Sequence, residues 1–352
     1  MSEKGPSDDQ DASRPDRGLR RTAELVGIGV TGVVAVAMLG FVLLYWAQDL
    51  PVASDLYAAF RSLGRGMDAA FGTNVFRHPI MWQSMAVGVL VGVVAPLVGS
   101  FLVHREMALI GETLAHTAFA GVAIGILVTS STGWNGSLLL VALVVGILGA
   151  LVVQWLTERT DAYGDVPIAI MLSGSFAVGT LIISYGDGLT GVNIRGYLFG
   201  NLAVVTPEGA RVMGALSLIV VAGVALTYKQ LLFITFDEQA ARVAQLNVTG
   251  YNTLLVVLTA VVVVGAMQVL GVILVAAMLV VPVAAASQIA RSFRETMYLA
   301  VIFGQLSVIG GFAVSIGLGL PSGGSIVVTA IAVYLATIVG SGFSVKAISA
   351  HG

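Results

Sequence analysis

The feature that most constrains this chain is a series of long apolar runs that recurs along almost its whole length. They lie near residues 24–47, 82–103, 108–128, 137–156, 166–185, 209–228, 251–269, 271–290, 298–317 and 324–342. As helices rising about 1.5 Å per residue, such runs cross the roughly 30 Å hydrocarbon core of a bilayer. They are continuous rather than alternating, which argues against membrane strands. The sequence therefore predicts an all-α polytopic bundle of about ten transmembrane helices, or nine if the stretch from 251 to 290 is one broken helix.

Composition supports a membrane protein and limits its chemistry. The chain is 57% hydrophobic and 10% charged, with a mean hydropathy of +0.96, whereas about a quarter of the residues of a soluble domain are charged. Its 43 glycines suit helices that approach each other closely in lipid. The sequence contains no cysteine, so a metal site would use nitrogen and oxygen ligands rather than thiolates.

Three sections of different composition set the expected domain organisation. Residues 1–21 are rich in Pro, Asp, Ser and Arg and are expected to form a disordered cytoplasmic tail. Residues 22–81 contain the first apolar run, interpreted as an added N-terminal transmembrane helix, and an amphipathic stretch at 52–72 that we place at the outer membrane surface. Residues 82–345 form the main membrane domain.

Basic residues between the runs predict the orientation of the bundle. With the N-terminal tail inside and the runs alternating, the outer side receives Arg61, Arg65, Arg77 and Arg195. The inner side receives the larger set, which is Arg14, Arg17, Arg20, Arg21, Arg105, Arg159, Lys229, Arg242, Arg291, Arg294 and Lys346. Because cytoplasmic loops carry the excess of Lys and Arg, both termini are expected in the cytoplasm of a cell-membrane protein.

One run carries two ionisable side chains, in the stretch "LIGETLAHTAFAGVAIG" from Leu109 to Gly125. Of the four histidines, only His116 falls within a predicted spanning run, and Glu112 is the only acid well inside one. A charge at the centre of a membrane helix costs about 2.5–3.5 kcal/mol on insertion scales, so such residues usually face the bundle interior or water. The spacing of four places both side chains on one helix face.

Three roles fit this pair, and the residues alone leave all three open. A carboxylate and an imidazole that converge on one face form half of a site for a divalent cation. The same groups suit a proton relay or a structural hydrogen bond. Zinc usually takes four ligands, so a metal site would need two more. A second copy of the chain, related by a two-fold axis along this helix, would supply them.

A polar break at 229–250 ("KQLLFITFDEQAARVAQLNVTG") is the longest on the expected cytoplasmic side after the tail. Within it "DEQAARVAQL" predicts a short helix with Asp237 near its N-terminus, where a negative charge suits the helix dipole. Its Ala-rich face could dock a soluble partner, and a solvated connector is the alternative. The chain has no G-x-x-x-x-G-K-[ST] motif, so any ATPase that drives it is a separate chain.

Three further segments carry weaker signals. Pro282 lies inside a predicted span and is expected to kink the helix there, and Ser287 follows it as a polar group for helix–helix hydrogen bonding or for a pathway. Residues 320–325 ("LPSGGS") predict an outer turn in which the glycines allow positive φ. Residues 193–202 ("NIRGYLFGNL") predict a short helix packed between others.

Five stretches, in this order, are shared with one known family: "HREMALIGETLAH", "YLFGNLAVVTPE", "FDEQAARVA", "LGVILVAAMLVVP" and "LPSGGSIVV". Together they resemble the membrane permease of ABC importers for zinc and manganese, over about residues 82–342. Two departures stand out. Glu112 replaces the family's Asp in its G-D-x-x-x-H core, and Leu246 and Asn247 stand where the family commonly has Gly.

The resemblance implies a transport subunit that is not itself an enzyme and has no permanently bound cofactor. Two permease subunits would pair around one pathway, two separate cytoplasmic ATPases would drive them, and an extracytoplasmic binding protein would deliver the ion. By resemblance Glu112 and His116 coordinate the metal, with Zn²⁺ favoured over Mn²⁺ or Fe²⁺. The segment that takes the place of the ATPase-coupling loop contributes Phe236, Asp237, Glu238, Ala241 and Arg242.

Other transport classes make different demands on the sequence. A permease for a metal chelate such as a siderophore or cobalamin favours a wide neutral cavity over an acid–imidazole pair. An ion-coupled secondary carrier favours two matching halves with broken helices, which this sequence does not display. An intramembrane enzyme would need a further internal histidine to complete its site, and the chain has none.

Overall fold

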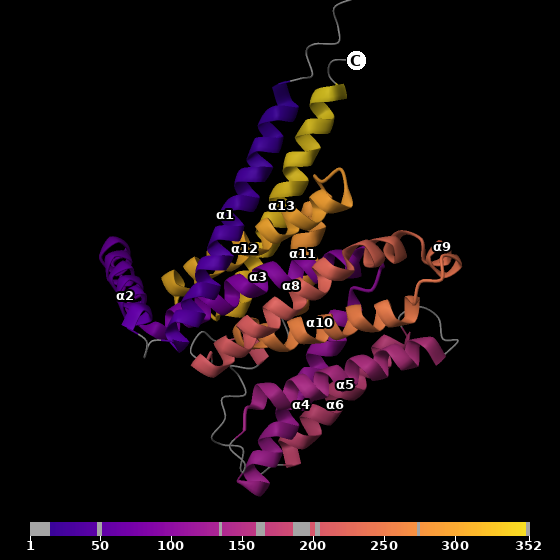
Figure 1. Cartoon of the computed structure of the whole chain (residues 1–352), viewed down its shortest axis with the longest axis horizontal. Coiled ribbons are helices and arrows are strands. Elements are labelled where there is room, and N and C mark those ends of the chain that lie inside the picture. The colour runs from indigo at the N-terminus through magenta and orange to yellow at the C-terminus, as the bar shows by residue number, and fades with distance from the viewer. Residues whose placement is uncertain are drawn as a thin grey trace, which may run out of the picture.

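The computed structural model describes residues 15–47, 51–133, 136–159, 166–185, 198–200, 205–272 and 275–349. These residues form twelve helices and no strand, as Figure 1 shows. The helices are α1 (Pro15–Trp46), α2 (Pro51–Phe71), α3 (Pro79–His104), α4 (Leu109–Thr132), α5 (Leu138–Arg159), α6 (Val166–Tyr185), α8 (Pro207–Phe236), α9 (Glu238–Val243), α10 (Val248–Leu270), α11 (Val275–Ser287), α12 (Phe293–Leu318) and α13 (Ser322–Ser349). The predicted all-α bundle is confirmed.

Within the described residues, nine helices are long and apolar enough to cross a membrane. The exception among the predicted runs is 271–290, where α11 contains only 13 residues. Gly271 ends α10 at a φ of +80°, and it lies so close to the backbone of residues 198–200 that a Cβ there would come within 2.3 Å of the Gly200 nitrogen. Glycine is therefore favoured at this helix end both by its positive φ and by the close approach of residues 198–200.

Helix α3 forms the centre of the bundle, with 83% of its spanning window buried. It packs against α1, α8, α10, α11 and α12, so its uniformly apolar sequence has no outward face to keep polar. Close contact depends on glycine at two points. A Cβ on Gly99 would lie 1.9 Å from the Leu279 carbonyl oxygen of α11, and one on Gly304 of α12 would lie 2.4 Å from that of Gly92. Small residues at such crossings let backbones meet.

One end of the bundle, called here the α9 end, gathers the last turns of α3 and α8 and the first turns of α10 and α12. The His104 ring of α3 lies 6.2 Å from the Phe236 ring of α8 and 4.9 Å from the Phe293 ring of α12, measured between centroids. In Figure 1 the start of α1 and the end of α13 lie together at the top, while α9 lies at the right. The cytoplasmic location of both termini stays a prediction.

The N-terminal section differs in part from its expected boundaries. Helix α1 begins at Pro15, so it includes the end of the segment expected to be a tail, and residues 1–14 lie outside the described part. Proline is favoured in the first helical turn because its missing N–H would be unpaired there anyway. The amphipathic stretch at 52–72 is helical as predicted, as α2. Its position at a membrane surface stays a prediction.

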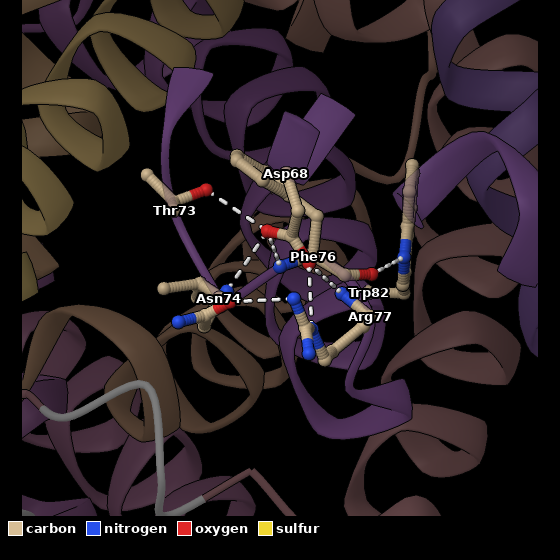
Figure 2. Close-up of polar contacts among 7 residues, drawn as sticks. Asp68, Thr73, Asn74, Phe76, Arg77 and Trp82 are labelled. Carbon is tan, nitrogen blue, oxygen red and sulfur yellow. Dashed lines mark hydrogen bonds and ion pairs between the residues drawn. The ribbon is translucent and has the colours of Figure 1, made fainter. Parts of the chain in front are cut away.

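The turn from α2 to α3 is organised around the carboxylate of Asp68, which is 3% exposed. Figure 2 shows this carboxylate among its donors, which are the Thr73 hydroxyl, the backbone N–H groups of Val75, Phe76 and Arg77, and Arg77 Nε. Burial alone would raise the pKa of Asp68, but these hydrogen bonds outweigh it and lower the pKa to about 2. The turn that joins the added section to α3 is thus fixed by one ionised side chain.

The fold differs from two smaller predictions. The turn expected at residues 320–325 lies earlier, because Gly319 has the positive φ of +66° and α13 already begins at Ser322. Gly323 is helical and is needed for close packing instead, since a Cβ there would lie 2.0 Å from the Leu270 carbonyl oxygen. Of the short helix expected at 193–202, only residues 198–200 belong to the described part.

Candidate functional site

Glu112 and His116 lie near the N-terminal end of α4, close to the α9 end of the bundle. Helix α4 begins at Leu109, so Glu112 belongs to its first turn and His116 to the next. The run predicted at 108–128 corresponds to α4, and Glu112 lies three residues after its first residue. A carboxylate in the first turn is stabilised by the helix dipole, which lowers the cost of keeping this charge. Glu112 is exposed and His116 is partly buried.

The imidazole of His116 is held between α4 and α6. The Phe176 ring of α6 meets it edge-on, with the two ring centroids 5.0 Å apart. Next to them in the sequence, the hydroxyls of Thr117 and Ser175 lie 3.0 Å apart and join the same two helices. The Nδ1 atom of His116 is buried without a hydrogen-bond partner. This nitrogen is therefore a donor or acceptor that has no hydrogen-bond partner among the described residues.

The pair stands on an open face of the bundle. On α4 the exposed residues beside it include Leu109, and on α6 they include Ser173, Gly174 and Phe176. The opposite side of α4 is covered by α5 and α10. Within the described residues, no three His, Cys, Asp or Glu side chains gather closely enough to hold a metal ion. One chain thus offers an acid and an imidazole on a surface, not a closed coordination site.

The predicted coupling segment forms a compact element of its own. Helix α8 continues to Phe236 and α10 starts at Val248, so the break is shorter than the 229–250 expected from polarity. As predicted, a helix follows Asp237, whose Oδ1 accepts the Ala240 backbone N–H at 2.8 Å. This is an N-cap, which satisfies one of the unpaired donors of the first turn.

The surface of α9 divides into a buried and an exposed side. Ala241 is fully buried and packs against Ile234 and Val248 at the bases of α8 and α10. On the exposed side Arg242 donates to Glu238 at 2.7 Å, an i, i+4 ion pair. Phe236, at the end of α8, is 63% exposed. The Ala-rich face expected to dock a partner is therefore occupied in part by the protein's own core.

Pro282 and Ser287 lie on another helix, α11. Pro282 is buried inside this helix, and the kink expected there stays a prediction. The Ser287 hydroxyl donates to the Ala284 carbonyl of its own helix, and the side chain is exposed. The expected helix–helix hydrogen bond from Ser287 is therefore not what the structure contains.

Arg105 is a residue whose role sequence reasoning missed. It lies in the turn between α3 and α4, and its guanidinium donates to Thr235 Oγ1 at 2.8 Å, to Asn252 Oδ1 at 2.6 Å and to the Leu231 carbonyl at 3.2 Å. Burial lowers the pKa of Arg105, while the Glu238 carboxylate acts to raise it. The only signal in the sequence was its place just before the acid–imidazole stretch.

The chain is similar in sequence and in fold to known membrane transport proteins. The family model of the ABC 3 transport family matches residues 77–341. A probable metal transport system membrane protein of Treponema pallidum is 31% identical over 264 residues, covering 75% of this chain and 96% of the relative. The manganese transport system membrane protein MntC of Halalkalibacterium halodurans is 30% identical, covering 74% and 87%.

More distant relatives extend the comparison. The high-affinity zinc uptake system membrane protein ZnuB of Haemophilus influenzae is 25% identical, covering 71% of this chain and 93% of the relative. The solved structure of PsaBC from Streptococcus pneumoniae in complex with Fab matches with a TM-score of 0.64 at 29% identity, over 73% of this chain and 90% of that one. The family match begins at residue 77, so α1 and α2 lie outside it.

Proposed function

Because the chain belongs to the ABC 3 transport family, we propose that it carries divalent metal ions across the membrane through a site formed by Glu112 and His116 of two copies. It is a multi-pass membrane permease of the manganese and zinc transporter group, and a separate subunit hydrolyses the ATP. The proposal concerns the pathway, the pairing of the subunits and the ion.

The observation that carries the proposal is the exposure of Glu112 on a spanning helix, one turn from His116. A carboxylate that faces lipid is costly, and an acid–imidazole pair supplies only two of the four ligands that zinc usually takes. Pairing two copies along the open face of α4 and α6 shields the carboxylate and completes the set of four ligands. It removes Glu112 from lipid and brings two oxygen and two nitrogen donors together.

The identity of the ion is a narrower question. The sequence motifs favour Zn²⁺, while relatives at 30–31% identity include proteins named for manganese and the zinc-named relative is at 25%. Imidazole and carboxylate ligands without sulfur suit either ion, and also Fe²⁺. We therefore propose Zn²⁺ and Mn²⁺ as the candidate substrates, with Fe²⁺ as a competitor. Binding must be weak enough to allow release.

The α9 end is proposed as the cytoplasmic side, where the ATPase docks. The 30 residues of α8 extend about 45 Å, against roughly 30 Å of hydrocarbon, so its last turns and α9 stand clear of the bilayer. There Phe236, Asp237, Glu238 and Arg242 form the surface that a soluble subunit can reach, and the buried Ala241 holds α9 against α8 and α10. An extracytoplasmic binding protein would deliver the ion at the opposite end.

The test is uptake into vesicles that contain this permease, its ATPase and its binding protein. We expect ATP-dependent uptake of Zn²⁺ or Mn²⁺, with each ion competed by the other and by Fe²⁺. Glu112→Gln and His116→Ala should abolish uptake while the complex still assembles. Glu208→Gln and His78→Ala, which change the same residue types at exposed positions elsewhere, should transport normally.

Other outcomes would overturn parts of the proposal. Uptake by either site variant at the wild-type rate would remove Glu112 and His116 from the pathway. Uptake of a metal chelate but of no free ion would favour the chelate class, and uptake driven by an ion gradient without ATP would favour a secondary carrier. Chemical crosslinking that finds the permease paired only with a different membrane subunit would exclude the homodimer.

A further inference from the structure

The turn that joins α3 to α4 has a fixed geometry. The Glu106 N–H donates to the Val103 carbonyl and the Met107 N–H to the Leu102 carbonyl, at 3.1 and 2.9 Å. Glu106 itself has a left-handed φ of +59°. These bonds form the Schellman ending of a helix. The turn is short, because α4 begins two residues after Met107. A displacement of the end of α3 is therefore passed directly to the first turn of α4.

Arg105 is the residue of this turn that reaches the other helices. Two of its acceptors, Thr235 Oγ1 and the Leu231 carbonyl, belong to the last turns of α8, and the third, Asn252 Oδ1, belongs to the first turns of α10. These two helix ends are the bases from which α9 projects. Arg105 thus holds both bases at once, across 126 to 147 residues of sequence.

The chemistry of this link makes it sensitive to movement. A guanidinium has donors in a fixed planar fork, and all three acceptors here are neutral oxygens. If α8 and α10 move relative to one another, the fork cannot follow both, and a part-buried donor loses its partner. Such a loss is costly. The low-energy response is for Arg105, and the turn that carries it, to move with the two helices.

We propose that Arg105 is a positioning residue that couples the α8–α9–α10 element to the first turn of α4, and through it to Glu112. The inference rests on the proposed function, because it assigns the metal site to α4 and the ATPase contact to α9. When the ATPase moves α9, the bases of α8 and α10 shift, Arg105 follows, and the carboxylate of Glu112 changes its position relative to the second copy.

The experiment measures coupling directly in the reconstituted complex of permease, ATPase and binding protein. The affinity for Mn²⁺ and for Zn²⁺ is determined with and without a non-hydrolysable ATP analogue, together with uptake and ATP hydrolysis. In the wild type we expect the analogue to change metal affinity by about tenfold or more. In Arg105→Gln the ratio of the metal affinities with and without the analogue should approach one, and ATP should be hydrolysed with little metal uptake.

Matched variants separate coupling from simple stability. Arg105→Lys should restore only part of the ratio, since one ammonium cannot span the three acceptors. Arg159→Gln, at an exposed arginine that ends α5, should leave the ratio unchanged. If Arg105→Gln does not assemble, Thr235→Val and Asn252→Ala each remove one acceptor and should lower the ratio.

Three results overturn the inference. The first is a wild-type ratio of the two metal affinities in Arg105→Gln. The second, where that variant does not assemble, is a wild-type ratio in both acceptor variants, and the third concerns the wild-type protein itself. If the wild-type protein itself binds and transports no divalent metal, the proposed function fails instead. If it transports metal but its affinity does not respond to nucleotide, the coupling inference alone fails.

Discussion

The Phe176 ring on α6 meets the imidazole of His116 on α4 edge-on, with ring centroids 5.0 Å apart and planes at 75°. Aromatic pairs in this arrangement contribute about 0.5–1.5 kcal/mol beyond the area they bury. The contact restricts the rotation of the imidazole while one ring nitrogen is buried and unbonded. Phe176 therefore orients the proposed ligand without coordinating the ion.

Truncation of Phe176 should weaken metal binding because the imidazole must then be ordered by the ion itself. We expect Phe176→Ala to raise the dissociation constant for Zn²⁺ or Mn²⁺ roughly two- to tenfold, measured by calorimetric titration of the purified complex. Val178→Ala changes another exposed side chain of α6 and should bind as the wild type does. Equal affinities in the two variants would contradict the orienting role of Phe176.

The Asp68 carboxylate predicts how the stability of the added N-terminal section depends on pH. Its pKa is lowered to about 2 from a usual value of 3.8, so the stabilisation is complete above about pH 4 and is lost as pH falls toward 2. Asp68→Asn should loosen the α2–α3 turn at neutral pH, because one amide oxygen replaces two acceptor oxygens and an NH₂ group faces the donors.

Hydrogen exchange of residues 68–77 measures this effect. In the wild type, exchange should accelerate as pH falls from 4 toward 2, after correction for the intrinsic pH dependence of exchange. In Asp68→Asn it should be faster at neutral pH and nearly insensitive to that range. Asp55→Asn, at an exposed acid of α2, serves as the control. The prediction is wrong if Asp68→Asn keeps the wild-type protection.

Close contact between α3 and α11 gives a prediction for the core. A Cβ on Gly99 would lie 1.9 Å from the Leu279 carbonyl oxygen, which is part of the backbone and cannot rotate away. Gly99→Ala should therefore force the helices apart and destabilise the protein by about 1–3 kcal/mol. Thermal unfolding in detergent measures the change as a lower midpoint temperature.

For a second glycine, an alanine substitution is expected to have the opposite effect on stability. Gly32 of α1 has no atom within 4 Å of the position that its Cβ would take. Gly32→Ala should be neutral or stabilising, by up to about 0.5–1 kcal/mol, since alanine favours the helix. Equal midpoints for Gly99→Ala and Gly32→Ala would show that the α3–α11 contact does not constrain the fold.

Apolar run length was sufficient to locate most helices, because in a bilayer each spanning segment must satisfy its own backbone hydrogen bonds. The run at 166–185 is α6 without change. The break between the runs 251–269 and 271–290 lies at Gly271 as expected, but the helix after it, α11, has only 13 residues. Apolar composition extended the run to 290 because it does not mark where a helix ends.

The residues of the candidate site also divide into those that the sequence identified and one, Arg105, whose role it did not reveal. Glu112 and His116 were identified because ionisable residues are rare in apolar runs, and Asp237 because N-caps have a local signature. Arg105 carried no such signal, since all three of its acceptors are more than a hundred residues away. The run predicted at 108–128 also located the start of α4 to within one residue, and with it the position of Glu112 in the first turn.

The N-cap of α9 tests whether the order of this short helix matters for transport. Asp237→Ala removes the acceptor of the Ala240 N–H, a loss worth about 0.5–2 kcal/mol. Amide exchange in residues 240–243 should accelerate roughly two- to thirtyfold, and ATP-driven uptake should fall as the docking surface loses its shape. Asp237→Asn keeps a good capping oxygen and should retain both protection and uptake.

Glu238→Gln breaks only an exposed ion pair, of the kind worth about 0.3–0.5 kcal/mol, and should change exchange little. Unchanged protection in Asp237→Ala would mean that packing of Ala241 alone maintains α9.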